Sequence, residues 1–416
     1  MLKKTIKLIK SNPFFSPLLF LIDLFLFSID LFATIGFRKK NPNKICIIKL
    51  DKLGDYVLIR NFFYRLRETD QYKNYKFSFI GNKENQKFAE YLDAGLFDKI
   101  IWVDIYKYAS HPFYRFAISR EIYREGFQIA IVPTYGRVLV LDDFVAFATR
   151  AAVRIGQHPH SVNIKKWEIK IGNGCYTQLI HVSDDIIFEF ERNKLFFEKL
   201  TGEDFSNIEP KINYSPPKHQ DQGQHVIFLP GAADKHRQWS SKNFAAVADW
   251  LTKEKKCRII LCGSPSEYQV GVDISNYSLQ PNNIENPIGL LTVPDLFGLL
   301  HDAKFILSNE TGAVHICAAL GKTVFCISNG NHFKKYTEYP PRLKKNVYYI
   351  YPAEVETLMK SSYEQAARKY DFKSDLDIDS ISPQKVINSI YSFFFNKNSD
   401  LKEADHEWRN RTKEQS

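Results

Sequence analysis

The chain lacks the sequence signals of several protein classes. Its cysteines are few and form no C-x-x-C pair, and several lie in apolar segments; they are Cys46, Cys175, Cys257, Cys262, Cys317 and Cys326. This spacing argues against a disulfide framework or a zinc site and is typical of reduced, buried cysteine in the cytoplasm. The chain also has no arginine-rich arm, zinc-finger spacing or RNA-binding signature, so no nucleic-acid partner is expected.

No uninterrupted apolar run reaches the length of a membrane span. Residues 14–37 are largely apolar, but Asp23 and Asp30 interrupt them, and together with Ser16 these residues are spaced by seven and share one helix face. No small-residue cleavage site follows, so a cleaved signal peptide is not expected. Basic residues flank the stretch on both sides; they are Lys3, Lys4, Lys7 and Lys10, then Arg38, Lys39, Lys40 and Lys44. We predict that residues 1–43 form an interfacial helix or hairpin on an anionic membrane surface. The alternative is a helix packed on the protein's own surface.

Chain length and net charge indicate the number of domains and the class of partner. The 416 residues are too many for one ordinary hydrophobic core, so two domains are expected. The formal net charge is +10, from 57 basic and 47 acidic residues, and it suits anionic partners such as nucleotides, phosphorylated glycans or anionic lipid. Charge alone does not choose among them.

Short apolar strands alternate with helical segments in two series, residues 44–217 and residues 224–396. A polar, proline-containing linker at 215–224 joins the two series. The alternation predicts an α/β fold with two doubly wound, Rossmann-like domains. Expected helices in the first series include residues 56–67, 116–125, 139–149 and 184–200. Residues 397–416 are polar with mixed charge and are predicted to be disordered.

Residues 305–333 place polar side chains between a predicted strand and a predicted helix. The strand covers residues 305–307 and the helix covers residues 313–320. In open α/β sheets, ligands lie beyond the carboxyl ends of the strands, where unpaired N–H groups attract phosphate. The polar residues at this place are Glu310, Thr311, Gly312 and His315. They are candidate ligand contacts; a helix cap, a turn and a satisfied core histidine are the alternatives.

Asp55 occupies the same kind of position in the first series. It follows a predicted buried strand at residues 45–48 and stands at the start of the helix at 56–67. It could cap that helix, which Asp does well, or act as a general base at the edge of the sheet.

Four segments together resemble glycosyltransferase family 9, the heptosyltransferase family of lipopolysaccharide core assembly. They are IIKLDKLGD at 47–55, LPGAADKHRQWSSKNF at 229–244, LCGSPSEY at 261–268 and SNETGAVHICAALGK at 308–322, each after a predicted strand. The resemblance covers residues 45–395. It implies a GT-B fold, in which two Rossmann-like domains face each other across a cleft, with the acceptor in the first and the donor in the second.

The activity that this resemblance implies is an inverting sugar transfer. A heptose or related sugar would pass from an ADP- or other nucleotide-sugar to a lipopolysaccharide core or another lipid-linked surface glycan. The protein would be cytoplasmic and peripheral on the inner face of the bacterial inner membrane.

The resemblance also assigns a catalytic pair. Asp55 matches the family's LGD aspartate, the expected base for the acceptor hydroxyl. Arg237 lies two residues before Trp239, where the family carries a cation for the leaving diphosphate, and its planar guanidinium suits phosphate oxygens. Simple solvation at the surface is the alternative for Arg237.

The remaining implied contacts belong to the donor. Backbone N–H groups would bind phosphate at Gly231, Ala232, Ala233, Thr311 and Gly312. Glu267 would accept ribose hydroxyls, unless it is only an exposed loop charge, and Glu310 replaces the family's usual Asp and would reach the donor sugar. His315 would orient the donor or a phosphate. Further candidate substrate contacts are Lys49, Gly54, Asn331 and His332.

Asn331 and His332 stand where many heptosyltransferases have a Gly-Pro-Thr/Ser turn. This departure favours a branch of the family with a different donor sugar or acceptor. The alternating acidic residues Asp375, Asp377 and Asp379 resemble a D-x-D metal site, but they precede a helix, where carboxylates are favoured anyway, and neither metal nor cofactor is expected.

Two other classes of function compete with sugar transfer. One is a catalytically silent nucleotide- or glycan-binding scaffold of an envelope assembly complex. The other is a nucleotide-dependent oxidoreductase, which is disfavoured because no G-x-G-x-x-G follows the first strand of either predicted domain.

Overall fold

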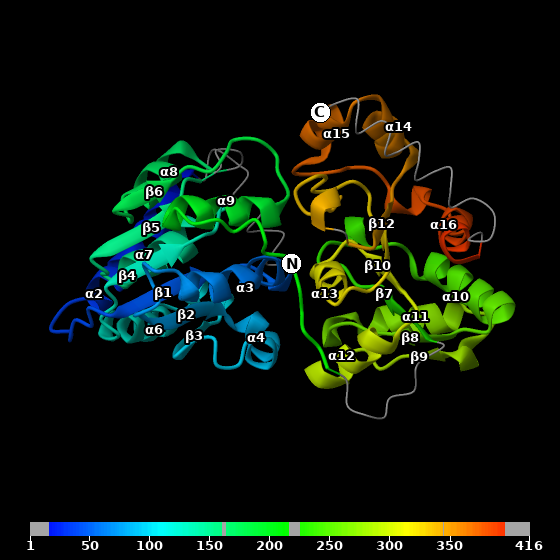
Figure 1. Cartoon of the computed structure of the whole chain (residues 1–416), viewed down its shortest axis with the longest axis horizontal. Helices are drawn as coiled ribbons and strands as arrows, with labels where there is room; N and C mark the ends of the chain where they lie inside the picture. Colours follow the sequence, from blue (N-terminus) through cyan, green and yellow to red (C-terminus); the bar gives the residue numbers. More distant parts are fainter. Residues whose placement is uncertain (1–15, 160–163, 216–224, 344, 396–416) are drawn as a thin grey trace. The chain divides into compact units, whose positions relative to one another are not determined.

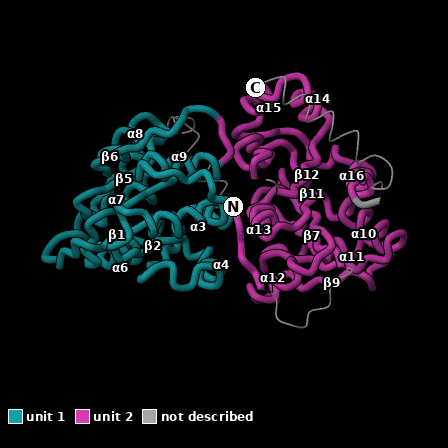
Figure 2. The backbone as a smooth tube through the Cα atoms, in the orientation of Figure 1, with its two compact units in different colours: residues 1–185, 189–210 teal, residues 186–188, 211–416 magenta. Residues whose placement is uncertain are grey.

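The computed structural model of the chain describes residues 16–159, 164–215, 225–343 and 345–395. The chain divides into two compact units (Figure 2). Unit 1 contains the chain up to residue 185 together with residues 189–210, and unit 2 contains residues 186–188 and the chain from residue 211. Most of the predicted linker and all of the predicted polar tail lie outside the described residues, as do the four lysines at the start of the chain.

Unit 1 is built on a parallel sheet with the strand order β3-β2-β1-β4-β5-β6 (Figure 1). Its strands are β1 (Lys44–Lys49), β2 (Lys76–Asn82), β3 (Lys99–Val103), β4 (Ile129–Val132), β5 (Val153–Gln157) and β6 (Gln178–Ile180). Residues 45–48 of β1 are fully buried. Such a continuous apolar run is typical of a strand that helices cover on both faces.

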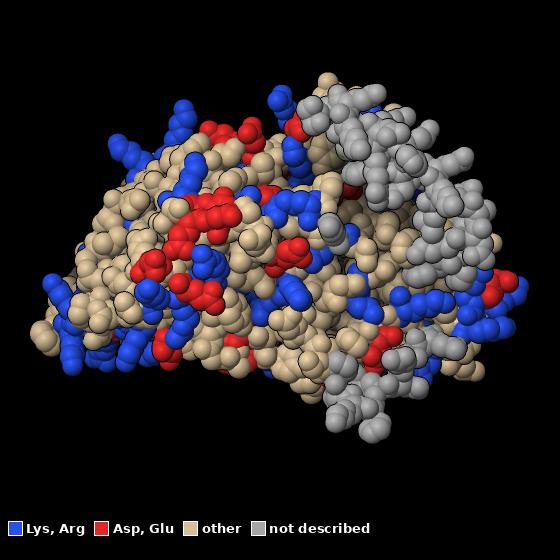
Figure 3. Space-filling model, in the orientation of Figure 1, with Lys and Arg blue, Asp and Glu red and all other residues tan. Residues whose placement is uncertain are grey.

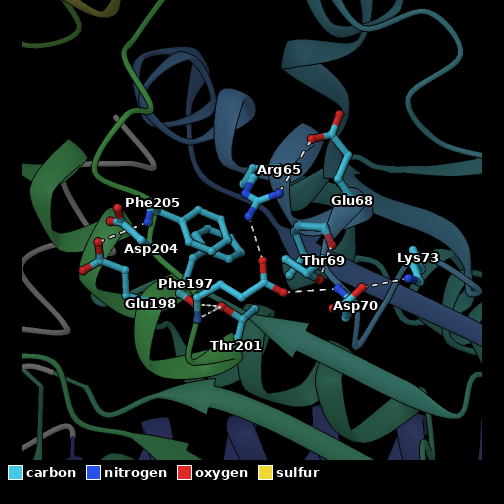
Figure 4. A network of polar contacts seen from close by, with 12 residues as sticks. Arg65, Glu68, Thr69, Asp70, Lys73, Phe197, Glu198, Thr201, Asp204 and Phe205 are labelled. Carbon is cyan, nitrogen blue, oxygen red and sulfur yellow. Dashed lines mark hydrogen bonds and ion pairs between the residues drawn. The ribbon is translucent and has the colours of Figure 1, made fainter.

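The helices of unit 1 follow the strands in alternation. They are α2 (Ser16–Ala33), α3 (Leu53–Glu68), α4 (Gln86–Leu92), α5 (Ile105–Ser110), α6 (Pro112–Arg124), α7 (Phe144–Ala148), α8 (Lys166–Asn173) and α9 (Glu189–Thr201). Helix α3 packs against α9, whereas α2 packs against α6 and α7. Near their carboxyl ends, α3 and α9 are joined through Glu203, which accepts hydrogen bonds from Arg65 Nη2 (2.8 Å) and from the Asp70 N–H (3.1 Å). Figure 4 shows Arg65 and Asp70 within this network of polar contacts.

Two predicted helices of unit 1 differ from the observed ones. Residues 139–149 do not form one regular helix, because a π-helical turn (Leu139–Asp143) precedes α7. The helix expected from residue 184 begins only at Glu189, because the chain before it is held in a turn by the Ser183 hydroxyl, which accepts a hydrogen bond from the Asp185 N–H (3.0 Å).

Helix α2 contains the predicted apolar N-terminal stretch. Its Asp30 is completely buried and forms an ion pair with Arg115 of α6, so one face of the helix is packed on the protein itself. Within the described residues, none of the helices combines the length and the apolar character that crossing a membrane requires.

Unit 2 repeats the topology of unit 1. Its parallel sheet has the order β12-β11-β10-β7-β8-β9, which is the same order read from the other edge. The strands are β7 (His225–Leu229), β8 (Arg258–Leu261), β9 (Ile284–Glu285), β10 (Ile306–Asn309), β11 (Val324–Ile327) and β12 (Val347–Ile350). The helices are α10 (Ser241–Lys255), α11 (Tyr268–Tyr277), α12 (Val293–Asp302), α13 (Gly312–Ala319), α14 (Ala353–Ser361), α15 (Tyr363–Tyr370) and α16 (Pro383–Phe395). The prediction of two Rossmann-like α/β domains is confirmed.

The strand order of each sheet defines one switch point. In unit 1 the first strand pairs with β2 on one side and β4 on the other, and in unit 2 β7 pairs with β8 and β10. Connections on the two sides of the first strand run in opposite directions, which opens a crevice at the carboxyl ends, and ligands of such sheets bind there. A ligand-binding site is therefore expected in the loops that follow β1, β4, β7 and β10.

Candidate functional site

Asn309 ties together the two loops at the switch point of unit 2. It is the last residue of β10, and its side-chain amide donates to the carbonyl of Pro230, directly after β7, at 2.7 Å. The side-chain oxygen Oδ1 of Asn309 accepts the backbone N–H of Trp239 at 3.2 Å. Trp239 is completely buried and donates its indole N–H to Ile381 at 2.8 Å. The segment between Pro230 and Trp239, which carries Arg237, is thus fixed at both ends.

Glu310 contacts side chains from two other loops, those after β7 and β11. Its carboxylate is 7% exposed, and Oε1 lies 3.3 Å from Nη1 of Arg237, which belongs to the short turn η4 (Lys235–Arg237) after β7. The Ser328 hydroxyl, after β11, donates to Oε2 at 3.3 Å. His332 Nδ1 lies 3.7 Å from Oε1. Arg237 is therefore positioned by a buried carboxylate and is not simply a solvated surface cation.

Thr311 begins helix α13 without capping it. It occupies the N-cap position in an extended conformation (φ −143°, ψ 169°), and its side chain makes no capping hydrogen bond. A purely structural N-cap would accept a hydrogen bond from a backbone N–H of the first helical turn, and the Thr311 hydroxyl does not. Gly312 is the first residue of α13, so the positive end of the helix dipole lies directly beside Glu310 at the switch point.

Gly231 and Glu267 lie in van der Waals contact. A Cβ atom built on Gly231 would lie 1.8 Å from Glu267 Oε1, so a side chain at this position would force the Glu267 carboxylate to move away. Glu267 Oε2 also accepts the Ser264 N–H at 2.6 Å, which fixes the turn η5 (Pro265–Glu267) after β8. The structure thus brings Glu267 to the loop of Gly231, Ala232 and Ala233, while one of its oxygens also has a structural partner.

His315 lies on α13 inside the core of unit 2. It is 5% exposed, its Nδ1 lies 2.7 Å from the hydroxyl of Tyr339, and its ring contacts Phe188. Burial lowers the pKa of His315 to about 4, so the imidazole is neutral at physiological pH. This environment matches the satisfied core histidine of the alternative interpretation.

The loop after β11 contains Asn331 and His332, where the sequence departs from the Gly-Pro-Thr/Ser turn of the family that it resembles. Asn331 Nδ2 donates to His332 Nδ1 at 3.0 Å, and Asn331 Oδ1 accepts the Ser374 N–H at 3.2 Å. His332 has a φ of 57°, in the left-handed region that non-glycine residues rarely adopt. His332 Nδ1 also lies 3.7 Å from Glu310 Oε1, so this departure belongs to the same cluster.

The switch point of unit 1 carries a second charged cluster. Lys49, the last residue of β1, is 1% exposed and pairs with Asp51 at 2.8 Å. The Thr134 hydroxyl, after β4, donates to the same carboxylate at 2.8 Å. Burial alone would lower the pKa of Lys49, but the carboxylates of Asp51, Asp55 and Glu189 raise it above the ordinary value. Lys49 therefore remains a buried cation surrounded by carboxylates.

Asp55 is the third residue of α3, after Gly54. The N-cap position belongs to Lys52, so Asp55 does not have the capping role that was its alternative. Its half-buried carboxylate is one of the negative charges that raise the pKa of Lys49.

Asp142, which the sequence analysis missed, adjoins this cluster. It is almost completely buried in the π-helical turn, and Oδ2 accepts the Val138 N–H at 2.8 Å, whereas Oδ1 has no hydrogen-bond partner among the described residues. Burial, followed by the charge of Asp51, raises the pKa of Asp142 to about 8, so a neutral carboxyl group is favoured. The only sequence signal was the Asp142-Asp143 pair within an otherwise apolar stretch.

The alternating aspartates near the end of unit 2 have local structural roles. Asp379 accepts the Ser240 N–H at 2.9 Å at the start of α10, and Asp377 accepts the Asp379 N–H at 3.0 Å. Asp375 pairs with Lys373.

A family model agrees with the motifs of unit 2. Residues 180–365 match the model of glycosyltransferase family 9 (heptosyltransferase), a span that contains the loops after β7, β8, β10 and β11. No curated protein matches the chain in sequence.

Solved structures of this family share the fold. A family 9 glycosyltransferase from Veillonella parvula is 16% identical, with a TM-score of 0.64, and the match covers 86% of this chain and 98% of that one. The E. coli ADP-heptose lipopolysaccharide heptosyltransferase II is 14% identical, with a TM-score of 0.60, over 86% and 100% of the two chains. The E. coli heptosyltransferase WaaC, solved with ADP, is 16% identical, with a TM-score of 0.59, over 84% and 99%. The structural similarity, expressed by these TM-scores, establishes the GT-B fold.

Proposed function

We propose that this chain, whose residues 180–365 carry the family 9 (heptosyltransferase) match, is an inverting glycosyltransferase. The donor is a nucleoside diphosphate sugar, either ADP-heptose or a related molecule, and unit 2 binds it. The acceptor is a lipopolysaccharide core or another lipid-linked surface glycan, and unit 1 binds it. Support for the donor class comes from WaaC, which has been solved with ADP and with ADP-2-deoxy-2-fluoro heptose.

One observation carries the proposal: Arg237 is held by the buried Glu310 beside the uncapped start of α13. A guanidinium offers five N–H donors, so a single contact with Glu310 leaves others for phosphate oxygens. The N–H groups at Thr311 and Gly312 add the positive end of a helix dipole. Both groups stabilise negative charge that grows on a departing diphosphate, without requiring a divalent cation.

The proposed step uses Asp55 as the base. Its carboxylate takes the proton of the acceptor hydroxyl while that oxygen bonds to the anomeric carbon of the donor sugar. The bond from this carbon to the diphosphate oxygen breaks, and the nucleoside diphosphate leaves with the electron pair. Attack from the face opposite the leaving group inverts the configuration. Lys49, at the end of β1, and Gly54, next to Asp55 in α3, are proposed acceptor contacts.

The other donor contacts follow from the same geometry. Glu267 is proposed to accept the ribose hydroxyls through the oxygen beside Gly231, and Glu310 is proposed to contact the donor sugar. Asn331 and His332 are proposed to select the sugar, because they complete the cluster where the family pattern differs. The neutral, buried His315 is proposed to support α13 through Tyr339 and so to position the donor only indirectly.

Replacing Arg237 tests the proposal directly. We expect Arg237→Ala to lower the rate of nucleoside diphosphate release from the cognate donor by about 10²–10³-fold in the presence of an envelope-glycan acceptor, because it removes one preorganised donor of positive charge. The cognate donor is identified first by thermal-shift screening of nucleotide-sugars. Activity should persist in a chelator.

Arg258→Ala is the matched control. Arg258 is an exposed arginine of the same unit, paired with Glu285, and it begins β8 at the amino end of the sheet. The control should keep wild-type turnover. A wild-type protein that binds a nucleotide-sugar but never transfers it would instead support the catalytically silent scaffold.

A further inference from the structure

Helix α2 exposes an apolar face that no described part of the chain covers. Eight of its large apolar side chains are 40–63% exposed, among them Leu21 (58%), Phe25 (55%) and Phe32 (63%). The chain that follows adds Ile35 (58%) and Phe37 (92%). Soluble surfaces rarely present so many contiguous large apolar groups, and patches of this kind mark interaction sites. We refer to these ten side chains as the α2 face.

The opposite side of α2 is locked onto unit 1. Asp30 accepts hydrogen bonds from Ser119 (2.7 Å) and Tyr108 (3.2 Å) in addition to its ion pair with Arg115, and all four side chains are buried. Phe27 packs between the rings of Phe144 and Phe147 of α7. The helix is thus an integral element of unit 1, whose outer face remains open.

The end of α2 is fixed in the same way. Arg120 donates to the carbonyls of Ala33 (3.0 Å) and Ile35, and Tyr123 donates to the carbonyl of Gly36. Arg38 donates to the carbonyls of Thr149 and Arg150. The segment that carries Ile35 and Phe37 is therefore held in place while both side chains point into solvent.

Positive charge accompanies this apolar surface. Residues 16–44 contain four basic and two acidic residues, and one of the two acids, Asp30, is buried against Arg115. Lys39 and Lys40 are exposed directly after Phe37. Figure 3 shows Lys and Arg side chains gathered at the end of unit 1 where Figure 1 places the chain after α2. Apolar groups beside basic groups are the combination that anionic bilayer surfaces attract.

We propose that the α2 face is a docking surface for an anionic lipid bilayer, with α2 lying in the plane of the headgroups. Leu21, Phe25, Phe32 and Phe37 enter the boundary of the acyl chains, and Lys39 and Lys40 contact the headgroups. Charge favours a bilayer over a second copy of the chain, because pairing two copies through this face would bring two basic rims together. The inference does not depend on the proposed sugar transfer.

Deleting α2 would be a poor test, because it would leave Arg115 buried without its carboxylate partner. Substitutions on the outer face avoid this problem. We expect the full-length protein to co-sediment with vesicles of phosphatidylcholine and phosphatidylglycerol, and Leu21→Ser/Phe25→Ser/Phe32→Ser to reduce the partition coefficient by about tenfold or more. Lys39→Glu/Lys40→Glu should reduce it by about fivefold per charge at low salt, and wild type should bind pure phosphatidylcholine weakly.

The matched control replaces three exposed apolar residues of unit 2, Tyr277 (59%), Leu279 (86%) and Leu290 (77%), by serine, and it should bind vesicles like wild type. Thermal melting of each variant verifies the fold. Equal vesicle binding by wild type and the α2 triple variant would overturn the proposal. So would a wild-type dimer in lipid-free sedimentation that the triple variant abolishes, because a second copy would then be the occupant.

Discussion

The candidate site in unit 2 depends on one residue, Glu310, which follows β10 and contacts the loops after β7 and β11. It stands where the family usually has Asp, and the longer side chain reaches Arg237, Ser328 and His332. The sequence could identify Glu310 and Arg237 as candidates, because each follows a strand and lies in a motif. It could not show that they form a pair, since residues 73 positions apart are joined only by the sheet order β7-β10.

Asp142 illustrates what local sequence cannot reveal. Its importance arises from neighbours on other elements, namely Asp51 after β1 and Lys49 at the end of β1, together with the adjacent Asp143. An aspartate in an apolar segment predicts a buried carboxyl group, but only the fold supplies the second acid beside it. The pKa of Asp142 is a consequence of tertiary structure and could not have been read from the residue itself.

Replacing Asp142 should change the pH dependence of stability. The folded state raises the pKa of Asp142 from an unfolded value of about 4 to about 8, so the folded protein binds an extra proton between these values. Stability from this group is complete below pH ~4 and is lost as the pH rises towards 8, by up to about 1.4 kcal/mol per pH unit. Asp142→Asn mimics the neutral acid and removes this loss.

Urea unfolding of wild type and Asp142→Asn at pH 5 and pH 8 measures the effect. The variant should gain stability relative to wild type at pH 8 compared with pH 5. A difference between the two proteins that stays constant across this range would contradict a neutral Asp142 in the fold.

At the scale of elements, the long periodic segments were predictable and the short or irregular ones were not. The helix predicted at 56–67 follows clear apolar periodicity and lies within α3. Strand β9 has two residues and β6 has three, too few for any periodicity. The π-helical turn before α7 breaks the helical register of residues 139–149, and it does so where Asp142 and Asp143 are buried.

Helix α2 also shows the limit of pattern analysis. The seven-residue spacing of Asp23 and Asp30 predicted a polar face, and Asp30 does lie on the inner face. Sequence alone left open whether the helix binds a membrane or the protein. The structure shows binding to the protein on the Asp30 side, and it leaves the other side as the α2 face.

The attachment of α2 should depend strongly on Asp30. Asp30→Ala leaves the Arg115 guanidinium buried without a counter-charge, and we expect a loss of about 3–5 kcal/mol in the free energy of unfolding of unit 1. Glu68→Ala, which removes an exposed carboxylate 4.0 Å from Arg65, should change it by less than about 1 kcal/mol. Urea unfolding monitored by circular dichroism compares the two variants, and similar small losses in both would show that the ion pair does not hold the helix.

At the scale of the whole molecule, the two units carry different chemistry on the same topology. Both sheets have the order that places a ligand site between the first and fourth strands. In unit 2 that place holds a cation and an uncapped helix start, whereas in unit 1 it holds a buried lysine among carboxylates. The family model covers mainly unit 2, where three of the four segments that resemble the family lie.

This division of chemistry predicts that donor binding and transfer can be separated by mutation. Asp55→Asn should leave the dissociation constant of the donor unchanged within about twofold and lower the transfer rate by about 10²–10⁴-fold, because it removes only the base of unit 1. Arg237→Ala should weaken donor binding as well as transfer, because it removes a charge-assisted contact to the diphosphate. Calorimetry with the cognate nucleotide-sugar, alongside the release assay, distinguishes the two variants. If Asp55→Asn weakened donor binding as much as Arg237→Ala does, the assignment of the base to unit 1 and of the donor to unit 2 would be wrong, even though the fold would remain that of a GT-B protein.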